Sequence, residues 1–273
     1  MMKNIHLHLI SDSTGETVSL VARACLAQFE DVAAKSHNWT LVRETDQLNE
    51  ILASIEENRG FVLYTVVDMA LRLKLEDGCR QLQVPCISLL DPIIGALGRY
   101  LGSEIKGRPG RQHEMDAEYF DRINAMQYVL SHDDGQMATD LNDADIVILG
   151  VSRTSKTPTC IYLANRGIKA ANIPIVPGCP LPSDLTALTG PLIVGLTNDP
   201  KSLVQIRRNR LRMLNQDEET NYVDIKTVSK EVHDAHRMFT NNNWPVIDVT
   251  RRSIEETAAY ILTLYERREK ESP

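Results

Sequence analysis

Apolar residues in the first part of the chain alternate between the spacing of strands and the spacing of helices. In HLHLIS (6–11), Leu7 and Leu9 fall on one face, as in a strand that is buried on one side. A polar turn then leads into TVSLVARACLAQF (17–29), whose apolar residues recur at helical spacing. We expect a helix at 46–57 and further strands at TLVRE (40–44), GFVLYTVV (60–67) and VPCISLLD (84–91). This alternation predicts a mostly parallel sheet.

The second part of the chain repeats the alternation after a glycine-rich stretch, 92–110, in which the periodicity weakens. Helical spacing returns at 115–131 and ends in an Asp-Asp-Gly turn, so we place a domain boundary at Gly135. The last helix should begin near Ser253, because Ser253 and Glu256 have the spacing of a capping box. The other expected elements are a helix at 201–214 and strands at DIVIL (145–149), IPIVP (173–177), PLIVGLT (191–197) and WPVIDVT (244–250).

The turn after the strand at 145–149 nearly matches a phosphate-binding loop. In GVSRTSKT (150–157), Gly150, Lys156 and Thr157 fit the motif G-x-x-x-x-G-K-[ST], and Ser155 stands where the second glycine is expected. Backbone N–H groups and the dipole at a helix N-terminus attract phosphate, the lysine reaches the outer phosphates, and the following hydroxyl can bind Mg²⁺. A left-handed backbone at Ser155 would cost on the order of 1 kcal/mol. The alternative is an ordinary capped helix N-terminus that carries a lysine.

With this loop, the pattern predicts an α/β protein of two domains. We expect an N-terminal α/β domain of βα units at 1–135, and a P-loop kinase-like α/β domain with a mostly parallel sheet at 136–273. The fractions of hydrophobic residues (42%) and charged residues (25%) are typical of globular proteins, so each domain should have a packed core.

Carboxylates in three other turns are candidates for acid–base chemistry. Asp12 lies in the hydroxyl-rich turn DSTGET (12–17), Asp133 lies beside His132 and Asp134, and Asp199 follows the strand expected at 191–197. Each pattern also has a structural explanation, because Asp and Ser cap helices and Asp-Gly favours turns. At 12–17 the functional alternative is a second contact to an anion or a substrate.

Basic residues gather in two segments. The helix expected at 201–214 carries Arg207, Arg208, Arg210 and Arg212, and the segment GRPGRQH (107–113) is basic and rich in glycine. The arginines of this helix either lie on a solvated surface or contact phosphate or an acidic partner. The segment 107–113 is either a linker or a flexible basic segment that approaches a bound anion.

Charge and cysteine content restrict the class of protein. The net charge of −7 argues against non-specific binding to nucleic acid or membranes. No apolar run approaches the roughly 20 residues that span a bilayer, and the first residues do not resemble a signal peptide. The 5 cysteines lack the spacing of metal ligands, so we expect free thiols in a reducing compartment and a cytoplasmic protein.

Blocks along almost the whole chain resemble one protein family. They are ISDSTGET (10–17), HDDGQ (132–136), ADIVILGVSRTSKTP (144–158), RGIKAANIPIVPG (166–178) and VGLTNDPKSLVQIRRNRL (194–211). They resemble the bacterial pyruvate, phosphate dikinase regulatory proteins, and the related phosphoenolpyruvate synthase regulatory proteins share them. The blocks at 150–158 and 166–178 are more similar to the dikinase branch. In this family position 155 holds serine or glycine.

The resemblance implies a bifunctional serine/threonine kinase and phosphorylase. Family members inactivate their target by moving the β-phosphate of ADP onto an active-site threonine, which leaves AMP. They reactivate it when inorganic phosphate attacks the phosphothreonine and yields pyrophosphate. The implied partner is pyruvate, phosphate dikinase, and a homodimer is implied as well. The implied nucleotide-binding segment consists of Gly150, Val151, Ser152, Arg153, Thr154, Ser155, Lys156 and Thr157.

Phosphoryl transfer depends mainly on positioning and on stabilisation of charge. Lys156 is expected to hold the donor phosphates, with Mg²⁺ at Thr157. A carboxylate must orient the threonine hydroxyl, and the catalytic candidates that the sequence does not separate are Asp12, Asp133 and Asp199. Three alternatives stay open: the same chemistry on phosphoenolpyruvate synthase, a P-loop kinase of small molecules, and a non-catalytic nucleotide-sensing module. The kinase of small molecules is kept because VIDVTRRSIEETAAYIL (246–262) resembles the C-terminal segment of many P-loop kinases.

Overall fold

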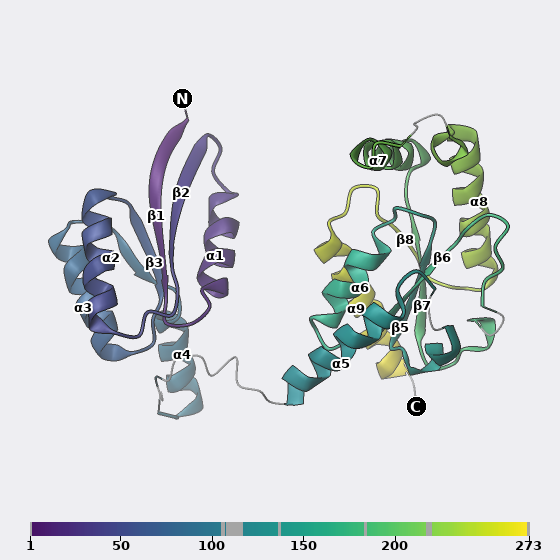
Figure 1. Cartoon of the computed structure of the whole chain (residues 1–273). Helices are drawn as coiled ribbons and strands as arrows, with labels where there is room; N and C mark the ends of the chain where they lie inside the picture. The colour runs from purple at the N-terminus through teal and green to yellow at the C-terminus, as the bar shows by residue number, and fades with distance from the viewer. Residues whose placement is uncertain are drawn as a thin grey trace. The chain divides into compact units, whose positions relative to one another are not determined.

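Each half of the chain forms a four-stranded, all-parallel β-sheet with helices against both faces (Figure 1). The computed structural model describes residues 2–104, 107, 117–135, 138–182, 185–216 and 220–271. The α/β class and the parallel sheets expected from the sequence are confirmed. No helix in these described ranges is long and apolar enough to cross a bilayer.

The chain divides into two compact units, Met1–Glu114 (unit 1) and Met115–Pro273 (unit 2). The division precedes α5 (Ala117–Ser131), whereas the sequence placed the boundary after this helix, at Gly135. The reason is that α5 packs against α6 and β6 of unit 2 and contributes Ala125 and Val129 to its core. The basic segment 107–113 lies, apart from Gly107, outside the described residues.

Unit 1 has the strand order β2-β1-β3-β4. One face of its sheet packs against α1, and the other packs against α2 and α3. Its elements are β1 (Lys3–Ser11), α1 (Glu16–Leu26), β2 (Val32–Trp39), α2 (Thr45–Glu57), β3 (Phe61–Thr65), α3 (Met69–Gln81), β4 (Cys86–Ser88) and α4 (Asp91–Leu101).

Unit 2 has the strand order β6-β5-β7-β8. One face of its sheet packs against α6 and α9 and the other against α7 and α8, so both faces are covered. After α5, its strands and α-helices are β5 (Ile146–Gly150), α6 (Lys156–Ala164), β6 (Ala170–Pro174), β7 (Leu192–Thr197), α7 (Pro200–Met213), α8 (Ile225–Asn241), β8 (Val246–Asp248) and α9 (Ile254–Glu271).

Two strands lie elsewhere than the sequence pattern predicted. The segment TLVRE (40–44) is not a strand: Leu41 has φ = 56°, and Glu44 forms a capping box with Gln47 at the start of α2. The strand is instead β2, a half-exposed edge strand whose residues, VAAKSHNW, show little alternation. In unit 2, β6 ends at Pro174, so it begins and ends earlier than the strand expected at 173–177.

Candidate phosphate-binding site

The phosphate-binding loop connects β5 to α6 at the carboxyl edge of the sheet of unit 2. All five residues of β5 are buried, which fixes the point where the loop begins. A Cβ atom on Gly150 would lie 2.7 Å from Thr154 Oγ1 and 2.8 Å from the Leu196 carbonyl oxygen, so this position requires glycine. Arg153 (φ = 73°) and Ser155 (φ = 61°) both have left-handed backbones. Non-glycine residues rarely adopt such angles, and they concentrate at functional sites.

Lys156 is buried at the first turn of α6, where the residue as a whole is only 6% exposed. Its ammonium donates a hydrogen bond to the carbonyl oxygen of Val151 in its own loop, at 3.1 Å. Burial lowers the pKa of Lys156 to about 8, and the nearby carboxylate of Asp134 acts in the opposite direction. A buried cation of this kind is stabilised by an anion that enters the loop.

Three side chains beside the loop form a closed hydrogen-bond cluster. The Thr157 hydroxyl donates to Asp133 Oδ1 at 2.9 Å, and the Asn172 amide lies 2.5 Å from the same oxygen and 2.9 Å from Thr157 Oγ1. Asn172 comes from β6, and its own carbonyl oxygen Oδ1 is buried without a hydrogen-bond partner. The cluster therefore joins the turn at 133–135 to the N-terminus of α6.

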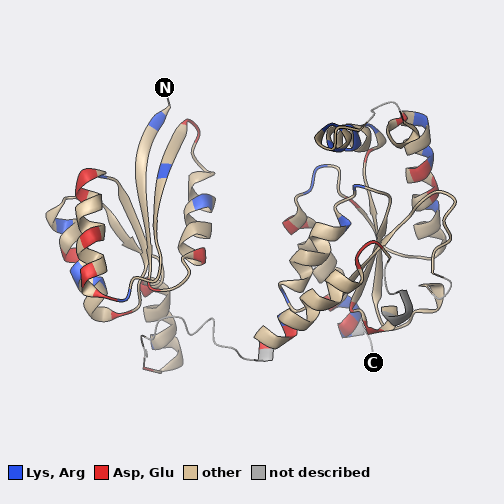
Figure 2. Cartoon of the chain, viewed as in Figure 1, with Lys and Arg blue, Asp and Glu red and all other residues tan. Residues whose placement is uncertain are grey.

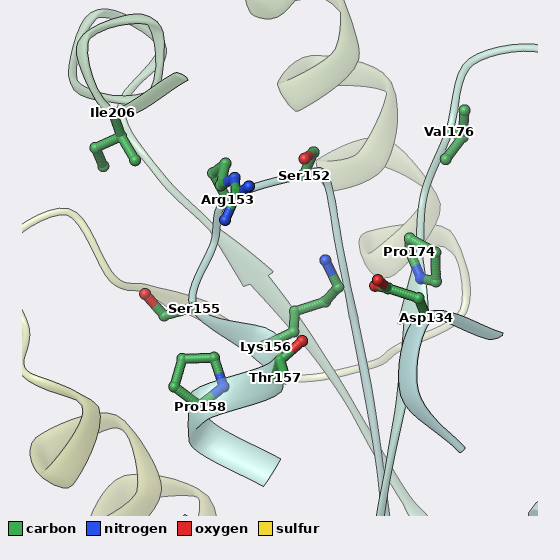
Figure 3. A pocket seen from close by; sticks show the side chains of 10 residues that line it. All are labelled: Asp134, Ser152, Arg153, Ser155, Lys156, Thr157, Pro158, Pro174, Val176 and Ile206. Carbon is green, nitrogen blue, oxygen red and sulfur yellow. The ribbon is translucent and has the colours of Figure 1, made fainter. Parts of the chain in front are cut away.

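A cavity of about 560 Å³ opens over the loop (Figure 3). Figure 3 shows the ammonium of Lys156 and the carboxylate of Asp134 directed toward the space between them. Asp134 reaches this position with a left-handed backbone (φ = 52°). The lining residues are Asp134, Ser152, Arg153, Ser155, Lys156, Thr157, Pro158, Pro174, Val176 and Ile206.

The donor atoms beside the loop suit Mg²⁺ that arrives with a nucleotide. In the described part of the chain, no group of three or more His, Cys, Asp or Glu residues could hold a metal on its own. However, Mg²⁺ is often bound by only one or two protein oxygens together with phosphate oxygens and water. Thr157 Oγ1 and Asp133 Oδ1, 2.9 Å apart, offer such a pair.

Arg207 of α7 ties the loop to two helices of unit 2. Its side chain is 1% exposed and pairs with Glu231 of α8 at 2.8 Å. It also donates to the carbonyl oxygen of Ser152 at 3.3 Å and to that of Tyr222 at 3.0 Å, and it lies over the Tyr222 ring. The Tyr222 hydroxyl in turn lies 2.9 Å from Ser152 Oγ. The middle of the loop is therefore held by buried polar contacts.

The structure separates the catalytic candidates of the sequence. Asp133 is bonded to the loop through Thr157. Asp199 caps α7 by accepting from the Ser202 N–H at 2.9 Å, and it lines a second cavity, of about 800 Å³, together with Asp248 and Arg251. The two cavities have no lining residue in common.

Asp12 belongs to unit 1 and has a structural role there. Its carboxylate accepts a hydrogen bond from the Val67 N–H at 2.7 Å, which joins the turn after β1 to the end of β3. Burial raises the pKa of Asp12, and this hydrogen bond opposes the change. Helix capping, the structural explanation expected for this turn, is not what the structure shows, because the N-cap of α1 is Gly15 and no side chain forms a capping hydrogen bond there. The second-anion explanation stays a hypothesis.

Several residues of the site were missed or misjudged from the sequence. Asn172 was not singled out, although a polar residue within an otherwise apolar buried strand is a usable signal. Arg207 was expected either at a solvated surface or against phosphate or a partner, yet it is buried against Glu231. Lys and Arg are the only charged residues of α7 (Figure 2). The sequence of this helix therefore does not indicate that Arg207 pairs with an acidic residue of another helix.

Comparisons with known proteins identify the family of this chain. The sequence model of the kinase/pyrophosphorylase family matches residues 7–262. A protein from Paramagnetospirillum magneticum is 59% identical over 266 residues, which cover 97% of this chain and 86% of that protein. Proteins from Caulobacter vibrioides (54% identical, 95% of this chain and 82% of that protein) and Erythrobacter litoralis (53%, 98% and 96%) are similar. All three are provisionally named pyruvate, phosphate dikinase regulatory proteins. The chain belongs to the kinase/pyrophosphorylase family.

Proposed function

We propose that this protein is a bifunctional serine/threonine kinase and phosphorylase that regulates pyruvate, phosphate dikinase. The observation that carries the proposal is the buried Lys156 at a phosphate-binding loop, beside the oxygen pair of Thr157 and Asp133. The family match and the names of the relatives support the protein target. ADP is the proposed donor, and AMP, inorganic phosphate and pyrophosphate are the other small molecules of the two reactions.

In the forward reaction, the hydroxyl oxygen of the target threonine attacks the β-phosphorus of ADP. The bond from this phosphorus to the bridging oxygen breaks, and AMP leaves with that oxygen. Lys156 exchanges its bond to the Val151 carbonyl for the phosphates, and Asp134, across the cavity, accepts the proton of the threonine. Mg²⁺ held at Thr157 and Asp133 would neutralise phosphate charge when it is bound.

In the reverse reaction, an oxygen of inorganic phosphate attacks the phosphorus of the phosphothreonine. The bond from this phosphorus to the threonine oxygen breaks, that oxygen regains a proton from Asp134, and pyrophosphate leaves. Both directions move a phosphoryl group between two oxygens, so one cation can serve both. The loop at 150–157 is therefore proposed as the phosphate site of both reactions.

The proposal is tested with purified pyruvate, phosphate dikinase and ADP labelled in the β-phosphate. Label should appear on a threonine of the dikinase, with one AMP formed for each label, and added phosphate should release it as pyrophosphate. Phosphoenolpyruvate synthase, offered in parallel, should take up little label. Turnover of ADP without any protein target would instead indicate a kinase of small molecules, and ADP binding without turnover would indicate a nucleotide sensor.

Lys156→Ala tests whether the two reactions share one site. Loss of a cation that stabilises a transferring phosphoryl group lowers rates by roughly 10²–10³. Both activities should fall together by about this factor, with unchanged circular dichroism. A variant that loses the kinase activity and keeps the parental phosphorylase rate would show that the reactions use separate sites.

A further inference from the structure

α7 has a second apolar side that does not face the core of unit 2. The residues that this helix buries are Leu203, Val204, Arg207 and Leu211. Ile206, Met213 and the C-cap residue Leu214 are apolar as well, yet they are 40%, 80% and 47% exposed. Their positions, i, i+7 and i+8, place them along one side of the helix, and Arg210, at i+4, lies between them. These four residues, Ile206, Arg210, Met213 and Leu214, are called the α7 strip below.

The strip begins at the phosphate cavity. Ile206 lines this cavity together with Arg153 and Lys156, and Figure 3 shows its side chain directed from α7 toward the loop. A helical turn rises about 5.4 Å, so Arg210 lies about one turn and Met213 about two turns from the cavity. A protein whose hydroxyl group enters the cavity must lie over its rim, and α7 forms one part of this rim. The strip is therefore placed where such a protein would make contact.

The strip carries a positive charge that the described residues do not neutralise. Every charged residue of α7 is Lys or Arg (Figure 2), although the chain as a whole has a net charge of −7. Arg207 is paired with Glu231, whereas no described carboxylate pairs with Arg210. An acidic group of a partner is attracted to such a position, and the attraction is strongest at low salt.

The composition of the strip favours a protein as the partner. Exposed apolar side chains that gather in one place mark interaction sites, and Met and Arg are enriched in protein–protein interfaces. Arg210 is the one residue of the strip whose side chain can bind a phosphate group, which is few for a surface that follows a nucleic-acid backbone. An apolar segment with a carboxylate beside it matches the strip better.

We propose that the α7 strip is the docking surface for the protein substrate, and that it binds a segment of that protein with apolar side chains and a carboxylate. The inference rests on the proposed function, because it requires a protein as the phosphoryl acceptor. The carboxylate pairs with Arg210, and the apolar side chains cover Ile206, Met213 and Leu214. Docking beside the cavity brings the accepting threonine toward Lys156 and limits phosphorylation to proteins that fit the strip.

Binding to purified pyruvate, phosphate dikinase, measured by biolayer interferometry without nucleotide, tests the strip. Arg210→Ser with Met213→Ser should raise the Kd for the dikinase at least about tenfold. Both side chains are exposed, so this variant should fold as judged by circular dichroism and should bind ADP like the parent in calorimetric titrations. Lys201→Ser with Arg208→Ser is the matched control. It removes two cations from the other side of the same helix and should leave the Kd within about threefold.

Kinetics with ADP labelled in the β-phosphate separate docking from chemistry. In the strip variant, the KM for the dikinase should rise by about the same factor as the Kd, and kcat should stay within about twofold, because the strip does not touch the transferring phosphate. With p-benzoylphenylalanine in place of Met213, irradiation should cross-link the chain to the dikinase segment that carries the labelled threonine. A cross-link to a second copy of this chain would overturn the proposal.

The remaining outcomes distinguish the strip from the proposed function. An equal Kd for the parent and the strip variant, an equal loss in the control, or a parent that does not bind the dikinase would each overturn the strip. The proposed function is judged by label transfer from the parent chain alone. A parent that labels the dikinase with a KM independent of Arg210 and Met213 keeps the function and loses the strip. A parent that binds through the strip without transfer of label keeps the strip and loses the function.

Discussion

At the scale of single residues, Lys156 determines what the loop can bind. Its ammonium is buried, and the hydrogen bond that it donates goes to a carbonyl of the same loop. A carbonyl compensates a buried charge only in part, which is why burial is the main cause of the low pKa, about 8. A phosphate would supply the missing negative charge and favour the protonated form. Nucleotide binding and protonation of Lys156 are therefore coupled.

This coupling predicts that ADP binds more weakly above pH 8. Only the charged form of Lys156 attracts phosphate, and with a pKa of about 8 that form falls from nine-tenths to one-tenth between about pH 7 and about pH 9. The dissociation constant for ADP should therefore rise roughly tenfold over this interval in calorimetric titrations. Lys156→Arg keeps its charge throughout and should show a flat profile. An equally steep profile in that variant would assign the pH dependence to another group.

Lys156 also has a defined effect on the stability of the protein without nucleotide. Its pKa is lower in the folded chain than in the unfolded chain, so between about pH 8 and about pH 10.5 the unfolded state binds more protons. Lys156 therefore makes the free energy of unfolding increase as the pH rises through that interval. Added ADP raises the pKa of Lys156 and should reduce that gain.

Ser155 is the departure from the usual loop, and its backbone explains why the departure is tolerated. Its φ of 61° is left-handed, its side chain forms no capping hydrogen bond, and its carbonyl oxygen accepts from Thr159. Ser155→Gly removes about 1 kcal/mol of strain and adds flexibility to the unfolded chain, effects of opposite sign. We expect ADP affinity within roughly tenfold of the parent by calorimetry. Complete loss of binding would show that the hydroxyl makes an essential contact with the nucleotide.

The residues of the candidate site that the sequence analysis also names are those fixed by local spacing. Lys156 and Thr157 were found because a loop motif fixes them relative to Gly150. Asn172 and Glu231 act through contacts with residues 39 and 24 positions away, and no local pattern records such pairs. Asp133 was one of three candidate carboxylates, and only the packing of the turn at 133–135 against β6 brings it to Thr157.

At the scale of elements, the loop is held in place by α7 and α8. Arg207 and Glu231 form a buried pair between these helices, and Arg207 also holds the carbonyl of Ser152. Removal of one partner of a buried pair leaves an uncompensated charge and destabilises a protein by about 3–5 kcal/mol. This pair therefore connects helix packing to the shape of the phosphate site.

Glu231→Ala should accordingly lower the free energy of unfolding by about 3 kcal/mol in denaturant titrations. It should also weaken ADP binding about tenfold, a loss of roughly 1.4 kcal/mol, because Arg207 would no longer be fixed by Glu231 and would hold the Ser152 carbonyl less firmly. Asp234→Ala is the matched control on the same helix, since Asp234 pairs with Arg237 at the surface and such pairs contribute about 1 kcal/mol or less. If the two variants lose the same amount of unfolding free energy and ADP affinity, the pair of Arg207 and Glu231 does not support the loop.

Elements were predicted well where one buried face produces a strong pattern. The strands β1, β3, β5 and β7 are central in their sheets and lie within or close to the expected segments. The edge strand β2 was missed because its exposed side chains show little apolar alternation, and TLVRE (40–44) was mistaken for it. α4 lay in a glycine-rich stretch of weak periodicity, although its helix has an apolar stripe. Edges and unpaired surfaces carry the weakest sequence signal.

At the scale of the whole molecule, the two units share an architecture that their sequences conceal. Both sheets have the same strand order, and in both a left-handed residue directly precedes the helix that follows the first strand: Gly15 (φ = 79°) before α1 in unit 1 and Ser155 before α6 in unit 2. The next residue is Glu16 in unit 1 and Lys156 in unit 2. A carboxylate thus replaces the cation, so the turn of unit 1 is poorly suited to phosphate. No sequence repeat indicated this likeness, because the two units share a topology and not side chains.

The division into units predicts that residues 115–273 bind ADP when expressed alone. All residues that line the phosphate cavity lie in unit 2, as do Asp133, Asn172 and the pair of Arg207 and Glu231. Unit 2 also contains two hydrophobic clusters, one on each face of its sheet, which give it a core of its own.

We expect this fragment to unfold cooperatively and to bind ADP within about threefold of the full chain, because it keeps all the residues that line the phosphate cavity. A threefold change is less than the tenfold change that corresponds to 1.4 kcal/mol. Calorimetric titration gives the affinity, and Lys156→Ala in the same fragment is the control that should abolish binding. A folded fragment without affinity for ADP would mean that unit 1 contributes a group to the nucleotide site. Asp12, the carboxylate candidate of unit 1, would then be the first residue to substitute in the full chain.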